Sequence, residues 1–376
     1  MTSAAYDVVV VGAGIVGAAC AAECAHEGFK VAIIESNIVG GGATAAGMGH
    51  IVVMDDSEAQ FALTRYSQSL WNELAQQLPR NIEYEACGTI WVAADEEEMA
   101  EVGRKEKFYR ERGVPVEILD AQALREAEPN LREGLLGGLR VPGDSVIYPP
   151  CAAQFLIEKA RSCGADLFLG HTFVGVTGDG AKLRDGSLLP AGLIVNAAGC
   201  WAPELTSGID LQKRKGHLVI TDRYPGFARH QLVELGYLKS AHSLTEDSVA
   251  FNIQPRPTGQ LLIGSSRQYG VEDSKVDAPI LSRMLRRAIE YMPKLARLST
   301  IRAWTGFRAA TPDKLPLVGP CPETDKVYLA TGHEGLGITT SLATAKILVD
   351  QIMNRPSAIP LGPYLPARIK QEAAYA

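Results

Sequence analysis

The sequence predicts an α/β fold in which a second, sheet-rich α+β domain interrupts the first domain in two places. The chain opens with an apolar run, a glycine-rich turn, a helix-length stretch and a second apolar run, which is the order of a βαβ unit. Two later apolar runs, at 193–199 and 327–332, also end in small-residue turns. The intervening segments alternate between apolar and polar residues, which is typical of half-buried strands. At 376 residues, the chain is longer than one hydrophobic core usually supports, so two domains are expected.

The opening βαβ unit carries the residues expected of a dinucleotide site. Gly12 permits a sharp turn out of the first strand, and Gly14 lets a pyrophosphate approach the helix start. Gly17 allows the helix to pack closely on the strand. Glu35 ends the second apolar run 18 residues after Gly17, near where a carboxylate reaches a ribose 2′-hydroxyl. The whole pattern predicts a site for an ADP-containing dinucleotide; the alternative is a glycine turn that binds nothing.

The other elements follow from periodicity and turn signals. Residues 40–49 are nearly all small, and we expect a loop against a flat ligand rather than a flexible linker. Helices are expected at 56–77, 96–112, 120–126, 149–163, 282–292 and 339–353. Strands are expected at 82–84, 89–93, 166–168, 216–220, 249–253, 260–264 and 327–330, with short strands over 173–194 and a hairpin around 134–143. These elements predict a nucleotide-binding domain at 1–55, 145–212 and 301–376, and a second domain at 56–144 and 213–300.

The composition is that of an ordinary globular protein, with 46% apolar residues, 21% charged residues and a mean hydropathy near zero. A net charge of −6 provides no electrostatic footprint for nucleic acid. The seven cysteines include no CxxC pair, which argues against a metal or iron–sulfur site held by this chain alone. With neither a signal peptide nor a transmembrane run in view, we expect a cytoplasmic protein, and peripheral membrane association stays open.

Five motifs together resemble the D-amino-acid-oxidase family of flavoproteins, which includes glycine oxidase, D-amino acid dehydrogenases and sarcosine oxidases. The motifs lie in the family's order along essentially the whole chain, at 12–17, 196–201, 305–313, 316–319 and 332–337. Within the family, the stretch 45–56 is most similar to β-subunits of heteromeric dehydrogenases that act on D-hydroxyproline or on opines.

The resemblance implies a Rossmann-type domain of the glutathione-reductase-2 kind that binds FAD. The residues implied for the phosphates and ribose are Gly12, Gly14, Ile15, Val16, Gly17, Glu35 and Ser36. Those implied along the pyrophosphate and ring are Gly42, Ala43, Thr44, Gly47, Met48 and Gly49, with Val174 meeting the adenine through its backbone and Ala198, Gly199 and Trp201 lining the cofactor. Those implied near the flavin are Gly332, Gly335, Leu336, Gly337, Ile338 and Thr339. A helix start is also chemically sensible there, because its dipole stabilises the negative charge that flavin reduction builds.

The resemblance also places a carboxylate-binding arginine at Arg308, and a guanidinium suits a planar carboxylate through two parallel hydrogen bonds. The alternative is a structural arginine paired with Asp313 or another acid. His50 and His333 fall in loops expected near the flavin, where either could tune the protonation of the substrate amine or bond the ring. Each is alternatively a loop histidine satisfied by the backbone.

Weaker candidates come from the second domain. Tyr237 and Tyr269 are expected either to cap the substrate or to pack in the sheet, and Arg256 and Arg267 are further candidates. Trp201 and Trp304 are alternatively expected to pack the domain junction. Residues 213–215 (Lys-Arg-Lys) are expected to form a solvated turn, or else to hold the phosphate of a second flavin, FMN, at a subunit interface.

Together these observations predict an FAD-dependent dehydrogenase that takes a hydride from a free amino acid at the C–N bond, leaving an imine. The resemblance favours cis-4-hydroxy-D-proline as substrate and partner subunits with FMN or an iron–sulfur cluster as electron acceptors. The alternatives are a stand-alone glycine, sarcosine or D-amino acid oxidase that uses oxygen, and an opine dehydrogenase β-subunit. A non-catalytic FAD scaffold or an NAD-dependent dehydrogenase would be of a different class.

Overall fold

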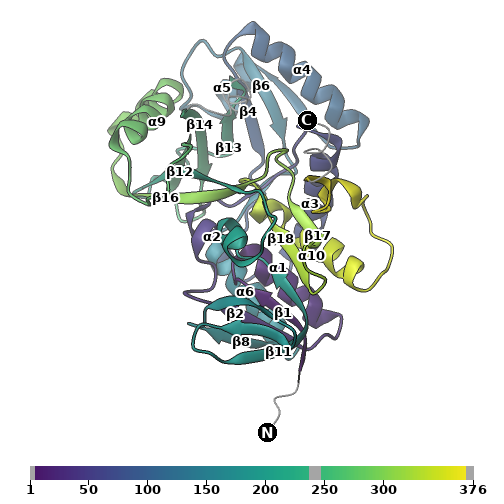
Figure 1. Cartoon of the computed structure of the whole chain (residues 1–376). Helices are drawn as coiled ribbons and strands as arrows, with labels where there is room; N and C mark the ends of the chain where they lie inside the picture. Colours follow the sequence, from purple (N-terminus) through teal and green to yellow (C-terminus); the bar gives the residue numbers. More distant parts are fainter. Residues whose placement is uncertain (1–4, 237–246, 370–376) are drawn as a thin grey trace. The chain divides into compact units, whose positions relative to one another are not determined.

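The chain leaves its first structural unit and returns to it twice. The computed structural model describes residues 5–236 and 247–369. Unit 1 consists of 1–82, 148–213 and 308–376, and unit 2 of 83–147 and 214–307. Figure 1 shows the elements of both units.

Unit 1 is built on a parallel sheet. Its strands are β1 (Tyr6–Val11), β2 (Val31–Glu35), β3 (His50–Ile51), β8 (Asp166–Leu169), β9 (Phe173–Thr177), β10 (Gly180–Leu183), β11 (Leu188–Asn196), β17 (Leu317–Pro320) and β18 (Val327–Thr331). Its helices are α1 (Ile15–His26), α2 (Gly42–Ala46), α3 (Glu58–Ala75), α6 (Pro149–Ser162), α7 (Ala202–Leu205) and α10 (Gly337–Ile352), with short 3-10 turns η1 (Arg80–Ile82), η2 (Gly199–Trp201) and η4 (Gly362–Tyr364). Strands β18, β11, β1, β2 and β8 run parallel in that order, and β17 joins antiparallel at one edge.

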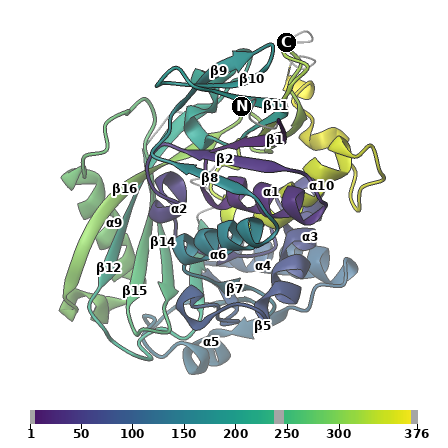
Figure 2. The same cartoon turned by 90° about the horizontal axis from the view of Figure 1, so that it is seen from below.

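Both faces of this parallel sheet are covered, which explains why β1 and β2 are continuous apolar runs. Helices α1, α6 and α10 pack together on one face, and α3 packs against α10. The hairpin β9–β10 covers the other face (Figure 2). There, Phe173 and Ala181 join a buried cluster with Val9 and Ile34. The parallel sheet therefore lies between two covering layers.

Unit 2 contains one large sheet with helices packed on it. Its strands are β4 (Thr89–Ala93), β5 (Glu117–Asp120), β6 (Gly137–Val141), β7 (Ser145–Val146), β12 (Gln212–Thr221), β13 (Gln231–Glu234), β14 (Ser248–Pro255), β15 (Leu261–Arg267) and β16 (Thr300–Ala310). Its helices are α4 (Glu96–Glu111), α5 (Ala121–Ala127) and α9 (Ala278–Tyr291), followed by η3 (Pro293–Arg297). The sheet order is β16-β12-β15-β14-β13-β4-β6-β5, and α9 lies against β14 and β15. Strands β12 and β16 also carry the chain between the two units.

The two helices α1 and α10 are joined by ion pairs near their C-terminal ends. Lys346 contacts Glu23 at 2.6 Å, and Arg355 binds both carboxylate oxygens of Glu27 at 2.9 and 3.0 Å. Arg355 also contacts Asp350 at 2.5 Å. These contacts lie at the opposite helix ends from the glycine-rich starts of α1 and α10.

Four expectations about the fold are wrong. Helix α3 belongs to unit 1 rather than to the second domain, because its buried face packs on α10. Residues 82–84 form no strand, since Ile82 closes η1 and Glu83 has a φ of 54°. No hairpin forms at 134–143, because β6 lies between β4 and β5. Residues 42–46, which lie within the expected loop 40–49, form the short helix α2.

The closest packing in unit 1 generates a stability prediction. A Cβ at position 17 would collide with the carbonyl oxygen of Gly12 and lie 3.2 Å from the Cβ of Ala197. We therefore expect Gly17→Ala to lower the free energy of unfolding by about 3 kcal/mol, since the helix must move off the strand. Urea denaturation followed by circular dichroism measures the change.

The matched control is Gly103→Ala, because Gly103 is exposed in α4 and a Cβ there would meet nothing within 4 Å. That variant should be more stable by up to about 1 kcal/mol, as alanine favours the helix. If Gly17→Ala and the wild type were equally stable, the prediction would be wrong, and α1 could move away from β1 without loss of stability.

Candidate cofactor and substrate site

The residues expected to bind FAD gather at one edge of the parallel sheet in unit 1. Gly12 follows β1, Ser36 follows β2, and Gly332 follows β18. The turn 197–199 follows β11. All four strands point the same way, so their carboxyl ends meet at one edge, the position where open α/β sheets bind ligands.

Glycines let three backbone segments approach one another at this edge. Gly12 has a φ of 101°, and a Cβ there would lie 2.7 Å from the carbonyl oxygen of Ala197. A Cβ on Gly14 would lie 3.2 Å from the Thr44 hydroxyl, which accepts a hydrogen bond from the Ile15 amide at 3.0 Å. Helix α2 therefore rests directly against the first turn of α1.

Three helices begin at this edge without a side-chain cap. Helices α1, α2 and α10 have Gly14, Gly41 and Leu336 at their N-caps, none with a side-chain capping bond, and none has an acidic residue in its first turn. Of the other helices, α3, α4, α5 and α9 are each capped by an aspartate or serine side chain, whereas α6 and α7 also lack such a cap. An uncapped helix start offers amide N–H groups and a positive dipole end to an anion, which suits a cofactor with a pyrophosphate.

The start of α10 also contacts the first turn of α1 and the C-terminal end of α2. A Cβ on Gly337 would lie 3.6 Å from the Val16 side chain, and one on Gly47 would lie 2.9 Å from Ile338. The Thr339 hydroxyl donates to the carbonyl oxygen of His50 at 2.8 Å. The segment from Gly47 through Met48 and Gly49 to His50 is thus fixed against the start of α10.

The carboxylate of Glu35 can accept further hydrogen bonds. One oxygen accepts the Ala13 amide at 2.8 Å and the other accepts the Asn37 amide at 2.8 Å. Each carboxylate oxygen can accept more than one bond, and the side chain is half-buried, so ribose hydroxyls fit here. Ser36, beside it, is exposed and accepts from the Asn37 side chain at 3.4 Å.

Two further segments fit the cofactor through their backbone. In the β9–β10 ladder, Gly175 pairs with Lys182 and Phe173 with Leu183, so the register shifts at Val174 and no residue stands opposite it. This bulge supports a backbone contact with adenine. In the turn after β11, the Ala198 amide donates to Asn196 at 3.2 Å, and the ring of Trp201 lies 3.4 Å from where a Cβ of Gly42 would be. Together with the glycine turns and helix starts, these features fit FAD.

Arg308 lies at the end of β16, in the part of that strand that belongs to unit 1. A Cβ on Gly335 would lie 3.3 Å from its Nε atom, so the guanidinium stem packs on the loop that leads into α10. Asp313 binds Arg368 through both carboxylate oxygens, at 2.6 and 3.1 Å. Both oxygens of Asp313, the acid named as an alternative partner of Arg308, thus bind Arg368, and Arg308 stands beside the helix start that fits the flavin.

Both candidate histidines are held neutral by burial. The His333 ring contacts the Thr344 hydroxyl at 3.0 Å, and burial lowers its pKa to about 3. Burial likewise lowers the pKa of His50 to about 4, and its Nε2 atom is buried without a hydrogen-bond partner among the described residues. A protonated imidazole is disfavoured at both positions, so neither acts as a strong base, and His333 ties its loop to α10.

The candidates from the second domain have internal partners. Arg256 binds both oxygens of Glu83 at 2.8 and 2.6 Å, which makes it a structural residue. The solvated turn expected at 213–215 is wrong: Arg214 and Lys215 are buried in β12. Arg214 lies over the Tyr269 ring at 5.1 Å, and Lys215 contacts Asp273 at 3.2 Å.

The remaining candidates are Tyr237, Arg267 and Trp304. Tyr237 lies outside the described residues. Arg267 ends β15, and Trp304 lies in β16 with the Arg302 guanidinium 5.8 Å from its ring. Over 5–236 and 247–369, no group of three His, Cys, Asp or Glu side chains could hold a metal ion. In the same ranges, no helix is both long and apolar enough to span a bilayer.

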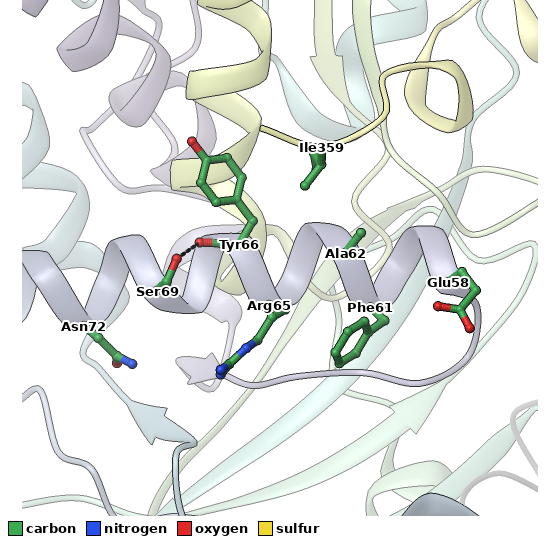
Figure 3. A pocket seen from close by; sticks show the side chains of 8 residues that line it. All are labelled: Glu58, Phe61, Ala62, Arg65, Tyr66, Ser69, Asn72 and Ile359. Atoms are coloured by element: carbon green, nitrogen blue, oxygen red, sulfur yellow. Dashed lines mark hydrogen bonds between the residues drawn. The ribbon is translucent and has the colours of Figure 1, made fainter. Parts of the chain in front are cut away.

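Unit 1 also has an open hollow of about 470 Å³ along α3 (Figure 3). Phe61, Arg65 and Asn72 point to one side of the helix, and Tyr66 points to the other, toward the side where Ile359 lies. The electrostatic neighbours of Tyr66 include Lys346 and Asp350, in the C-terminal half of α10. No residue that lines this hollow belongs to the set expected to bind FAD.

Sequence reasoning missed two residues that support the site. The Trp71 indole is fully buried and donates to the Ile338 carbonyl at 3.2 Å, in the first turn of α10. Arg368 holds the turn after β16 through Asp313. The apolar face of α3 was visible in the sequence, but neither partner could be read from it, because 267 positions separate Trp71 from Ile338.

Comparison with known proteins bears on this geometry. The model of the family described as FAD dependent oxidoreductase (DAO) matches residues 7–351. Glycine oxidase from Geobacillus kaustophilus is 29% identical, and the match covers 96% of each chain. Hydrogen cyanide synthase subunit HcnC from Pseudomonas aeruginosa is 26% identical, with 98% of this chain and 97% of that protein covered.

Solved structures show the same fold. The crystal structure of the Geobacillus kaustophilus glycine oxidase has a TM-score of 0.87 and covers 97% of this chain and 99% of its own. L-proline dehydrogenase from P. horikoshii, at 23% identity, has a TM-score of 0.86 with 98% of each chain covered. The α/β fold with a sheet-rich second part, expected from the sequence, is confirmed.

The buried state of His333 predicts a pH effect on stability. Its pKa is about 3 in the folded protein and ordinarily 6.5, so between these values the unfolded chain binds more protons. This contribution is complete above pH 6.5 and decreases as the pH falls, by up to about 1.4 kcal/mol per pH unit. We expect His333→Asn to flatten the dependence of the unfolding free energy on pH between 7.5 and 5, measured by urea denaturation.

His171→Asn is the control, because the His171 ring bonds the carbonyl of Leu169 at an exposed position of the same unit. It should leave the wild-type slope unchanged. Parallel curves for the wild type and His333→Asn would mean that the buried imidazole is protonated without unfolding.

Proposed function

Because this chain belongs to the DAO family of FAD-dependent oxidoreductases, an enzyme family that acts on amino acids, we propose that Arg308 anchors the carboxylate of a free amino acid while its C–N bond is oxidised. The observation that carries the proposal is the packing of Arg308 on Gly335, in the loop that leads into the uncapped start of α10. The guanidinium thereby stands beside the part of the site that fits the flavin.

The chain's own residues would hold the cofactor by its anionic and polar parts. The amides at the starts of α1 and α2 would bind the pyrophosphate, Glu35 the ribose, and the peptide groups of Val174 the adenine. When bound, the flavin supplies the acceptor for the two electrons that leave the substrate. The start of α10 favours negative charge beside the ring, which assists its reduction.

The substrate would be oriented by charge rather than by an acid–base pair. Arg308 can bind both oxygens of a carboxylate, which fixes the Cα–H bond relative to the flavin. His50 and His333 stay neutral at physiological pH, because their pKa values are about 4 and 3. The residues near the flavin therefore position an amino acid whose own amine assists the oxidation.

We propose cis-4-hydroxy-D-proline as the first substrate to test and partner subunits with FMN or an iron–sulfur cluster as electron acceptors. The partner proposal is supported by the similarity to HcnC, which is named as a subunit of hydrogen cyanide synthase. The substrate proposal is supported by the resemblance of residues 45–56 to β-subunits of dehydrogenases that act on D-hydroxyproline or opines.

A second candidate is a stand-alone oxidase, and the similarity to glycine oxidase at 29% identity favours it. The two functions differ in where the electrons go. An oxidase forms one hydrogen peroxide for each amino acid consumed by the isolated chain in air. A dehydrogenase bleaches its flavin with substrate under nitrogen and forms little peroxide until an artificial acceptor is added.

The role of Arg308 is tested by anaerobic titration of the FAD-loaded protein with cis-4-hydroxy-D-proline, D-proline, glycine and sarcosine. We expect Arg308→Ala to retain FAD and to weaken substrate binding about 100-fold, because two charged hydrogen bonds are lost. Absorbance of the flavin band reports both quantities.

The control is Arg256→Lys, which changes an arginine already bound to Glu83 and should leave substrate affinity unchanged. An unaltered titration of Arg308→Ala would remove Arg308 from the site. A yellow wild type that no amino acid bleaches would instead favour a scaffold that binds FAD without oxidising a substrate.

A further inference from the structure

We propose that Arg368 is a positioning residue that holds Arg308 in place for the substrate carboxylate through the turn 311–316. This inference rests on the function proposed for Arg308. It assigns a role in substrate binding to a residue 60 positions further along the chain, beyond all five motifs identified in the sequence.

The Arg368 guanidinium is unusually well satisfied. It binds Asp313 at 2.6 and 3.1 Å, the carbonyl oxygen of Leu315 at 2.6 Å and that of Pro316 at 3.0 Å. A further bond reaches the carbonyl oxygen of Leu365 at 3.2 Å. The side chain is only 13% exposed, so these bonds are shielded from water. One side chain thus binds three residues of the turn, Asp313, Leu315 and Pro316.

The turn is also braced from within. The Thr311 hydroxyl donates to the Leu315 carbonyl at 2.8 Å, and the Leu315 amide donates to Asp313 at 3.1 Å. Although burial acts to raise it, the pKa of Asp313 lies below its ordinary value because Arg368 bonds the charged form. The carboxylate therefore stays ionised and keeps both sets of bonds at neutral pH.

This turn directly continues the strand that carries Arg308. Ala310 forms a bridge with His333, and the Ala309 carbonyl accepts the Glu334 amide at 2.8 Å. Thr311 also packs on Gly332, where a Cβ would lie 2.8 Å from its methyl group. The end of β16 is therefore held on one side by the loop into α10 and continues into the turn that Arg368 holds.

Arginine suits this position better than lysine would. Only a planar fork bonds two carboxylate oxygens and the neighbouring carbonyls at once, whereas an ammonium group would reach a subset of them. Without the fork, the turn would relax, and Arg308 would lose its fixed relation to the flavin. A displacement of about 1 Å in a positioning group is enough to weaken binding or turnover severely.

The test measures carboxylate binding without turnover. FAD-loaded protein is titrated with acetate, which cannot be oxidised at a C–N bond, and the flavin absorbance reports occupancy. We expect Arg368→Ala and Asp313→Asn each to raise the acetate Kd about tenfold while FAD is retained. The double variant should bind acetate no more weakly than either single variant, because each single substitution already removes the same Arg368–Asp313 contact. The acetate Kd of Arg368→Lys should lie between those of Arg368→Ala and the wild type. In turnover of an amino acid substrate, the same variant should change KM more than kcat.

Arg355→Ala is the matched control. Arg355 likewise binds two carboxylates, Glu27 and Asp350, but it joins helix ends far from the α10 start. It should lower the melting temperature and leave the acetate Kd unchanged. An unchanged acetate Kd in Arg368→Ala and Asp313→Asn would overturn the proposal, and so would an equal loss of affinity in Arg355→Ala. If Arg368→Ala fails to fold, Arg368→Lys and Asp313→Asn decide in the same way.

Arg308→Ala separates this inference from the proposed function. If it leaves the acetate Kd unchanged, the carboxylate site itself is misassigned. If it weakens acetate binding about 100-fold while the Arg368 variants do not, only the positioning role fails.

Discussion

The close packing of α1 on β1 is the constraint on which the rest of unit 1 depends. Gly17 lies so near the Gly12 carbonyl that no side chain fits between them. This approach puts the first turn of α1 at the sheet edge, where α2 and α10 also begin. The starts of α1 and α10 meet there without side-chain caps, and an anion beside them would balance the partial positive charge of both helix ends. This arrangement therefore suits the binding of a cofactor that carries a pyrophosphate.

Charge is distributed around this edge in a consistent way. The helix starts and Arg308 favour anionic groups, namely the cofactor's phosphates and the substrate's carboxylate. The two histidines add no positive charge, because burial keeps both imidazoles neutral. Glu35 is the exception, and it stands where hydroxyl groups rather than phosphates are expected. Such a pattern needs no catalytic triad, since orientation and a prepared electron acceptor supply most of what amine oxidation requires.

Several cations of this chain stabilise the fold through carboxylate and aromatic partners, and only some of them stood out in the sequence. In unit 2, Arg256 binds Glu83, Lys215 binds Asp273, and Arg214 lies over Tyr269. In unit 1, Arg355 and Arg368 join distant segments through carboxylates. A buried guanidinium is costly unless its donors are satisfied, so such residues mark contacts that fix one conformation. Arg308 differs in that it packs on a glycine loop beside the cofactor edge.

The βαβ unit, the glycine turns, the acid at Glu35 and the family resemblance can all be read from the amino-acid sequence alone. Those features are local, because a glycine turn or an uncapped helix start depends only on residues that are adjacent in the sequence. Long-range packing, by contrast, places α3 against α10, the Asp313 carboxylate against Arg368, and the buried His333 ring against Thr344. These facts depend on residues that are far apart in the chain. Which partner a charged or buried side chain finds is settled by packing, which no periodicity encodes.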